Sequence, residues 1–317
     1  MIIVTGGAGF IGSNLVAALN AGGETDILIV DRLAENFRNL CDLRFSDFMQ
    51  PDEFLAALAA ESFRKPIEVI FHQGACADTT LSDGAYMMEN NFTFSRRILD
   101  FALEHKVPLV YASSASVYGA GRSWRAIPDD ERPLNLYALS KLAFDNHVRA
   151  RLGEAESTVA GLRYFNVYGP RERHKGKMAS MVYQLYRQLK QNGRARLFEG
   201  TGGYRDGEQR RDFVFVRDVV SVNRFFAGRP APVKGIFNVG TGASRSFNDV
   251  ARALMKSLGK GEIEYIPFPE SLQGKYQSFT EADVSALREA GYNQGFASIE
   301  QGIAESAASW EQEDLAP

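Results

Sequence analysis

Cysteine is scarce in this sequence, which has two, Cys41 and Cys76, among 317 residues. Neither belongs to a CxxC pair or a Cys/His cluster, so the sequence gives no support for a structural zinc site. Two cysteines are also too few for a disulfide framework in a chain of this length. A reducing compartment is the simpler interpretation, and we expect a cytoplasmic protein.

Long apolar runs and an excess of positive charge are missing as well. Residues 1–23 carry no charged side chain, but they contain no basic region, and glycines and asparagines interrupt their apolar run. We therefore expect neither a signal peptide nor a membrane span. The 36 basic and 39 acidic side chains give a net charge of −3, which argues against a nucleic-acid partner. With 45% apolar and 24% charged residues, the composition is typical of a globular protein.

Glycine, by contrast, is abundant, and its excess begins in the segment TGGAGFIG at residues 5–12. This segment follows a predicted strand at 2–5 and opens a predicted helix at 10–21, which is the context of a dinucleotide-binding turn. Gly6, Gly9 and Gly12 would let the backbone approach a pyrophosphate, and the helix N-terminus offers free N–H groups to it. Asp31 lies 19 residues after Gly12, where a carboxylate can accept hydrogen bonds from ribose hydroxyls.

The residues after the second predicted strand bear on whether the dinucleotide is NAD or NADP. Asp31 alone favours NAD, whereas Arg32 beside it and Arg38 nearby could hold a 2′-phosphate. The alternative is that both arginines are solvated surface charges. We expect NADP, with NAD as the second choice.

Strand-like and helical patterns alternate through the first half of the chain. We predict strands at 27–31, 67–72, 109–113 and 159–165, and helices at 52–63, 86–105 and 134–151. This alternation predicts an α/β fold with a Rossmann doubly wound parallel sheet. After residue 165 the pattern changes and predicts a smaller α+β lobe. We expect a polar loop at 166–177 and an exposed glycine-rich loop at 200–211. We also expect helices near 178–191, 246–258, 281–290 and 298–312, and short strands at 213–216 and 236–239.

A serine, a tyrosine and a lysine suggest acid/base chemistry beside the dinucleotide. Ser114 lies in SSASVYG at a predicted strand end, and Tyr137 and Lys141 are spaced i, i+4, so they share one helical face. A phenol has an unperturbed pKa of about 10. A neighbouring ammonium and a positively charged nicotinamide both favour the phenolate, which makes Tyr137 a workable base. Ser114 could donate to the reacting oxygen, and Lys141 could hold the nicotinamide ribose.

Five segments together resemble the extended short-chain dehydrogenases/reductases that act on nucleotide sugars. They are TGGAGFIG (5–12), SSASVYG (113–119), YALSK (137–141), RYFNVYGPR (163–171) and RRDFVFVRDV (210–219). The resemblance implies a Rossmann domain at 1–167, which segments at about 212–242 rejoin, and a substrate lobe formed mainly by 168–211 and 243–317. The 4,6-dehydratases of this family carry an acid pair where this chain has Ala115 and Ser116, so dehydration is disfavoured.

The segment HKGKMAS (174–180) resembles the ADP-glycero-manno-heptose 6-epimerase branch of that family, as do most other parts of the chain. This resemblance implies an isomerase that oxidises C6 of an ADP-heptose to a ketone and reduces it again on the opposite face. Tyr137 would be one acid/base group and Lys175 the other. It also implies a homo-oligomer, a pentamer, in heptose supply for lipopolysaccharide core. The alternatives are another nucleotide-sugar epimerase, such as a UDP-hexose 4-epimerase, and a non-catalytic cofactor-binding protein.

The resemblance also implies two sets of binding residues. The cofactor set comprises Gly6, Gly9, Phe10, Ile11, Gly12, Asp31, Arg32, Gln73, Gly74, Ala75, Cys76, Ala77, Asn90, Lys141, Val167 and Lys175. The substrate set comprises Asn166, Lys177, Gln184, Phe198, Glu199, Gly200, Thr201, Arg211 and Tyr276. Lys177 and Gln184 depart from the family pattern, which has a small polar residue and a histidine there. Pro51 stands in place of a cofactor-contacting lysine, and residues 201–210 are several residues longer than expected.

Overall fold

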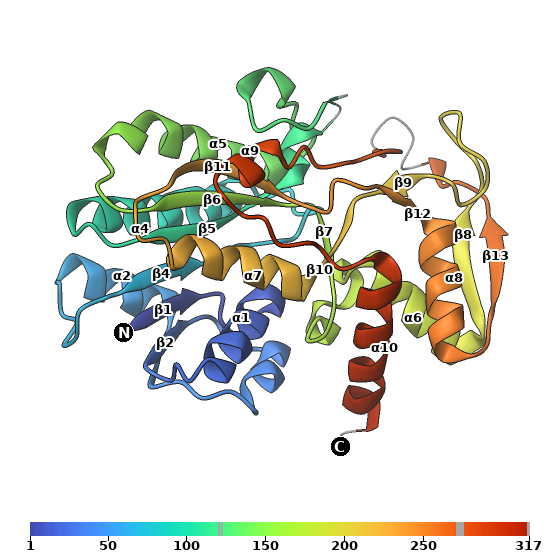
Figure 1. The fold of residues 1–317 in the computed structure, drawn as a ribbon, viewed down its shortest axis with the longest axis horizontal. Helices are drawn as coiled ribbons and strands as arrows, with labels where there is room; N and C mark the ends of the chain where they lie inside the picture. Colours follow the sequence, from blue (N-terminus) through green and yellow to red (C-terminus); the bar gives the residue numbers. More distant parts are fainter. Residues whose placement is uncertain (120, 122, 271–275, 316–317) are drawn as a thin grey trace.

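The computed structural model describes residues 1–119, 121, 123–270 and 276–315, and its largest element is a seven-stranded parallel sheet (Figure 1). The strand order is β11 (Lys234–Val239), β6 (Val159–Tyr164), β5 (Leu109–Ser114), β4 (Val69–His72), β1 (Ile2–Thr5), β2 (Ile27–Val30) and β3 (Asp47–Met49). The predicted doubly wound sheet is therefore confirmed. The direction of winding reverses between β1 and β4, the position where folds of this kind bind their ligands.

Helices cover both faces of this sheet. Alternate side chains of β1 point to opposite sides, so Ile2 and Val4 join one apolar cluster and Ile3 joins another. The first cluster includes side chains of α1 (Phe10–Ala21) and α7 (Val216–Ala227). The second includes side chains of α2 (Pro51–Ala59), α4 (Phe94–Glu104) and α5 (Leu136–Arg151). Both faces of the sheet are covered by apolar side chains, which is why the strand sequences are continuous apolar runs.

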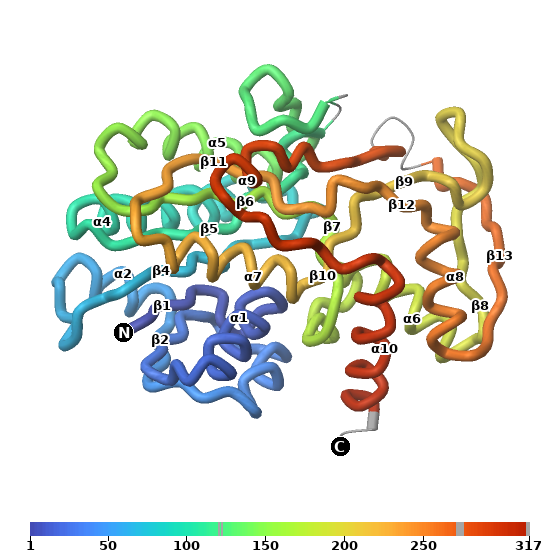
Figure 2. The backbone as a smooth tube through the Cα atoms, viewed as in Figure 1, coloured from blue at the N-terminus to red at the C-terminus, as the bar shows by residue number. Residues whose placement is uncertain are grey.

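The second half of the chain builds a smaller lobe at one end of the sheet (Figure 1). Its apolar core joins α6 (Met181–Asn192), β8 (Arg194–Phe198), α8 (Phe247–Leu258) and α10 (Ile299–Leu315). Short pairs of strands complete it: β8 with β13 (Glu262–Ile266), β7 (Asn166–Tyr168) with β10 (Phe213–Phe215), and β9 (Arg210–Arg211) with β12 (Arg245–Ser246). Between β10 and β12 the chain crosses to the large sheet, and Figure 2 shows β11 alongside β6, with α9 (Ser285–Glu289) above them.

Several predicted elements differ from the observed ones. The helix expected at 86–105 is divided into α3 (Gly84–Met88), a π-helical turn (Glu89–Thr93) and α4. Strands β3, β7, β8 and β13 were not predicted, because they are short or partly exposed and pair with distant segments. Further 3₁₀ turns occupy Glu35–Leu40, Ala115–Tyr118, Pro128–Asp130, Leu152–Glu154 and Arg173–Met178.

The uncharged stretch at residues 1–23 becomes part of the central layer. It forms β1, the glycine turn and α1, and its apolar side chains are buried in the sheet. Across the described part of the chain, the helices offer no segment with the length and hydropathy needed to cross a bilayer.

Candidate functional site

A cavity of about 500 Å³ lies between the large sheet and the smaller lobe. Its sheet side is formed by residues that follow the carboxyl ends of β4, β5 and β6, the edge at which parallel sheets bind ligands. The structure brings together at this cavity most of the side chains singled out from the sequence. These are Phe10, Ile11, Gln73, Ala75, Ala77, Ser114, Tyr137, Lys141, Asn166, Val167, Lys175, Phe198, Arg211 and Tyr276.

The glycine turn between β1 and α1 has the shape of a phosphate cradle. Gly6 has a φ of +67°, which favours glycine. A Cβ at Gly12 would collide with the Gly6 carbonyl oxygen. The N-cap of α1 is Gly9, whose residue type supplies no side-chain hydrogen bond to the first turn, so this end of the helix offers backbone N–H groups to an anion. These residues fit the pyrophosphate of a dinucleotide.

Asp31 and Arg32 follow the end of β2, where the sequence predicts the adenosine part of the dinucleotide. Asp31 accepts hydrogen bonds from the backbone N–H groups of Ala8, at 2.9 Å, and of Arg32, at 2.7 Å. These bonds lower the pKa of Asp31, but burial raises it by more. The Arg32 side chain is exposed and lies 3.8 Å from Asp52, and Arg38 is also at the surface. Both arginine side chains are exposed and so accessible to an added phosphate.

Helix α5 carries Tyr137 and Lys141 into the cavity. The Asn135 side chain caps the helix by accepting the N–H of Ala138 at 2.8 Å, which places Tyr137 in the first turn and Lys141 one turn later. Lys141 is buried, and its Nζ donates to the carbonyl of Ala112 at 2.8 Å. Burial lowers the pKa of Lys141 to about 8. It raises the pKa of Tyr137, although the neighbouring Ser114 hydroxyl lowers it, so the chain alone keeps Tyr137 a phenol.

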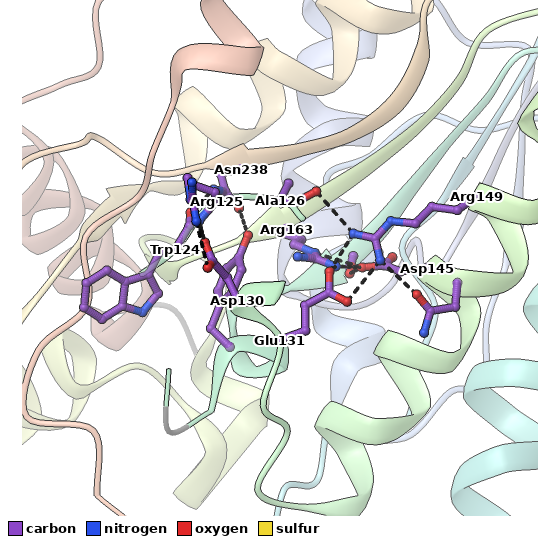
Figure 3. A network of polar contacts seen from close by, with 12 residues as sticks. Trp124, Arg125, Ala126, Asp130, Glu131, Asp145, Arg149, Arg163 and Asn238 are labelled. Carbon is purple, nitrogen blue, oxygen red and sulfur yellow. Dashed lines mark hydrogen bonds and ion pairs between the residues drawn. The ribbon is translucent and has the colours of Figure 1, made fainter. Parts of the chain in front are cut away.

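A network of buried charges anchors this helix to the sheet (Figure 3). Asp145, one turn beyond Lys141, accepts hydrogen bonds from Tyr111 at 2.9 Å, Ser113 at 2.8 Å and Arg163 at 2.9 Å. Figure 3 shows Arg163 and Arg149 converging on Glu131. Because Tyr111 and Ser113 lie on β5 and Arg163 lies on β6, the network links the helix bearing Tyr137 to the strands beneath it.

Lys175 also lines the cavity, and it lies on the segment that follows β7. Its Nζ lies 5.3 Å from the centroid of the Phe10 ring, in cation–π range. Burial lowers the pKa of Lys175, and nearby Glu172 raises it. Glu172 is fully buried, and its pKa is raised to about 7. Lys175 is therefore a cavity residue, in contrast to the solvated loop cation that a run of four basic residues could equally indicate.

Arg211 places a positive charge at the cavity, on the side of the smaller lobe. It is 8% exposed, and its guanidinium lies 4.8 Å from the Tyr276 ring centroid and 5.8 Å from that of Phe247. Among the described residues no carboxylate lies within ion-pair distance of it, and burial lowers its pKa. A buried cation without an acidic partner is suited to an anionic ligand.

Other predicted residues are not brought to the cavity wall. Asn90 donates to the Tyr86 carbonyl, Lys177 is exposed, and Gln184 donates to the carbonyls of Ala179 and Lys177. Gly74 and Cys76 do not line the cavity themselves, although their neighbours Gln73, Ala75 and Ala77 do. Glu199, Gly200 and Thr201 likewise follow Phe198, which lines the cavity, without lining it themselves. Lys177 and Gln184 therefore do not line the cavity in this structure.

The loop at 200–211 is less exposed than predicted. Asn248 donates to the Asp206 carbonyl at 2.8 Å, and Gln209 donates to the Glu199 carbonyl at 3.0 Å. These contacts bury Gln209, which lines the cavity and was missed from the sequence. Glu172 was missed as well. No spacing rule identifies either, because each is buried by segments distant in the chain.

Comparison with known proteins agrees with this geometry. A model of the NAD dependent epimerase/dehydratase family matches residues 2–240. The ADP-L-glycero-D-manno-heptose-6-epimerase of Alkalilimnicola ehrlichii is 52% identical over 305 residues, which cover 96% of this chain and 95% of that protein. The protein of the same name in Thiobacillus denitrificans is 49% identical over 319 residues, covering 95% and 96%. The crystal structure of the Helicobacter pylori protein of that name has a TM-score of 0.84 and 31% identity, covering 97% and 94%.

Proposed function

The chain belongs to the NAD dependent epimerase/dehydratase family, and we propose that it interconverts ADP-D-glycero-β-D-manno-heptose and ADP-L-glycero-β-D-manno-heptose with bound NADP. It is an epimerase, and the names of its near full-length relatives support the choice of sugar. The observation that carries the chemistry is that Tyr137, on α5, and Lys175, on the segment after β7, line one cavity. An epimerase must serve two faces of one carbon, and two acid/base groups carried into one cavity by separate elements meet that requirement.

When bound, the nicotinamide would accept a hydride from C6 of the sugar and return it to the opposite face of the C6 ketone. Tyr137 would take the proton from the C6 hydroxyl of one epimer, and Lys175 would give a proton to the ketone oxygen as the other epimer forms. Ser114 would donate a hydrogen bond to the reacting oxygen, and Lys141 would hold the nicotinamide ribose. The buried phenol needs a nearby positive charge to ionise near neutral pH, because burial raises its pKa.

The same proposal assigns the two ends of the ligands. NADP is favoured over NAD because the exposed Arg32 guanidinium follows Asp31 at the end of β2, within the reach of a ribose 2′-phosphate. Arg211 would bind the diphosphate of the sugar nucleotide through its planar fork of donors. Residues 1–167 with 212–242 would hold the cofactor, and the remainder would mainly hold the substrate.

The resemblance to heptose epimerases further supports a cytoplasmic homopentamer that supplies heptose for lipopolysaccharide core. Sedimentation analysis of the purified protein tests this assembly.

An incubation with ADP-heptose that is deuterated at C6 tests the proposed reaction. Purified protein is incubated, without added cofactor, with ADP-D-glycero-β-D-manno-heptose that carries deuterium at C6, and the epimers are separated. We expect the L-glycero epimer with deuterium retained at C6, because the same hydride returns to that carbon. If no epimer forms even after NADP is added, the heptose assignment is wrong. Turnover of UDP-glucose in the parallel sample would then support a UDP-hexose 4-epimerase.

A further inference from the structure

A buried carboxylate closes the segment that carries Lys175. Glu172 has no exposed surface, and its two oxygens accept three hydrogen bonds. Oε1 accepts from the N–H of Gly169 at 3.2 Å and from the hydroxyl of Ser180 at 2.8 Å, while Oε2 accepts from the N–H of Ser180 at 2.6 Å. Gly169 precedes Lys175 and Ser180 follows it, so one side chain ties the start of the segment to its end.

The outer side of the segment is held by different contacts. Asn39 donates to the Arg171 carbonyl at 3.1 Å, and Arg171 pairs with Asp42 at the surface. The backbone of the segment is also strained at Arg171, a non-glycine residue with a φ of +69°. Backbone of this kind keeps its shape only when surrounding contacts hold it. On the cavity side, Glu172 provides such contacts.

We propose that Glu172 is the positioning residue of Lys175. Its three hydrogen bonds hold the segment at 169–180 closed, and the Lys175 amine thereby stays over the Phe10 ring and inside the cavity. This inference rests on the proposed acid/base role of Lys175. Glu172 itself lines no part of the cavity and is assigned no contact with substrate or cofactor.

Helix capping alone does not account for a charged group here. The Ser180 hydroxyl already caps α6 by accepting the N–H of Tyr183 at 3.1 Å, and a neutral side chain could complete the turn without the desolvation of a carboxylate. A carboxylate can accept from several donors at once, whereas a glutamine of the same shape offers one acceptor oxygen. Its negative charge also favours the protonated form of Lys175, whose pKa is lowered by burial.

Two variants and a matched control test the assignment. Glu172→Ala removes all three contacts, and Glu172→Gln keeps the volume but leaves at least one backbone N–H opposed by an amide donor. Asp218→Asn is the control, because Asp218 is also a buried carboxylate with a raised pKa, but it lies on α7 and accepts from the N–H of Ala297 rather than from the segment at 169–180. For each protein we would measure kcat and KM for the ADP-heptose. We would also measure the acetylation rate of Lys175 relative to exposed Lys177 by mass spectrometry.

We expect Glu172→Ala to lower kcat about tenfold or more and to raise the Lys175/Lys177 acetylation ratio by a similar factor. Losing a buried hydrogen bond to a charged acceptor shifts a local opening equilibrium by about that amount. KM should change less than kcat, because Arg211 and Phe198 lie on another element, and Glu172→Gln should lie between Glu172→Ala and the parent. Asp218→Asn should match the parent in both readouts.

Three results would overturn the proposal. One is a Glu172→Ala protein with parental kcat and acetylation ratio, and another is a loss of kcat without any change in that ratio. The third is an equal change in Asp218→Asn. If Glu172→Ala does not fold, Glu172→Gln decides by the same criteria. If the parent protein does not epimerise the heptose, the proposed function fails, while the acetylation ratio still decides whether Glu172 holds the Lys175 segment.

Discussion

Replacing Arg211 tests whether this buried cation binds a ligand or stabilises the fold. The side chain is buried between Tyr276 and Phe247, and its only hydrogen bond within the described residues is donated by Nη1 to the Arg210 carbonyl at 2.9 Å. No carboxylate among those residues lies within ion-pair distance. Folding therefore desolvates the guanidinium without an ion pair that would offset the cost. We expect Arg211→Met, which keeps much of the apolar stem, to leave the unfolding temperature unchanged or higher.

The same substitution should weaken binding of ADP, which carries the diphosphate of the proposed substrate. A bidentate guanidinium–phosphate contact contributes two charge-assisted hydrogen bonds, together about 3 kcal/mol at the low end of their range. That energy corresponds to roughly a hundredfold increase in Kd. Arg211→Lys should lie between, because an ammonium keeps the charge but not the planar fork.

Isothermal titration calorimetry with ADP and thermal unfolding of the same samples provide the assay. Arg210→Met serves as the control, since Arg210 is engaged with Ser244 and its loss should lower stability while leaving ADP affinity intact. Parental ADP affinity in Arg211→Met would refute the anion site. A large fall in its unfolding temperature would show that Arg211 is structural.

The remaining predictions concern the reaction, the cofactor and acid stability. Tyr137→Phe and Lys175→Met should each lower kcat at least about hundredfold without changing the dinucleotide that co-purifies, as measured by chromatography after denaturation; parental turnover in Lys175→Met would remove it from the mechanism. Arg32→Ala should lower the preference for NADP over NAD about tenfold or more in titrations with both, and an unchanged preference would show that Arg32 is only a surface charge. Burial lowers the pKa of His72 from 6.5 to about 3, so the folded ring stays neutral while the unfolded ring takes up a proton below pH 6.5. Stability should therefore fall, by up to about 5 kcal/mol, as the pH drops from 6.5 towards 3. Denaturant titrations at pH 7 and pH 4 should show a smaller drop for His72→Asn, and an equal drop in both proteins would contradict the assignment.

Local patterns in the sequence were sufficient for the sheet and for one wall of the site. Strand β1, the glycine turn and α1 follow one another in the chain, so their roles could be read from adjacent residues. Tyr137 and Lys141 share a face because 3.6 residues make one helical turn. The strand-end position of Ser114 was equally local. Each of these predictions depended on residues no more than a few positions apart.

The π-helical turn shows where such patterns fail. Periodicity over 86–105 predicts one continuous helix, yet the chain widens at Glu89–Thr93. There the Asn91 side chain accepts the N–H of Cys76 at 2.7 Å and donates to its carbonyl at 3.0 Å. This partner is 15 residues away and on another element, so no helical spacing indicates it. The strands β8 and β13 were missed for the same reason, since they pair across more than sixty residues.

A dinucleotide-binding α/β fold and the Ser114, Tyr137 and Lys141 set could be predicted from the amino-acid sequence, because these features depend on short-range patterns along the chain. Contacts between distant segments bring Lys175 and Arg211 to the same cavity, leave Lys177 and Gln184 out of its wall, and let Glu172 close the loop that carries Lys175. Exposure and charge pairing arise from contacts between segments far apart in the chain. A run of basic residues in the sequence therefore does not show which of its members face solvent.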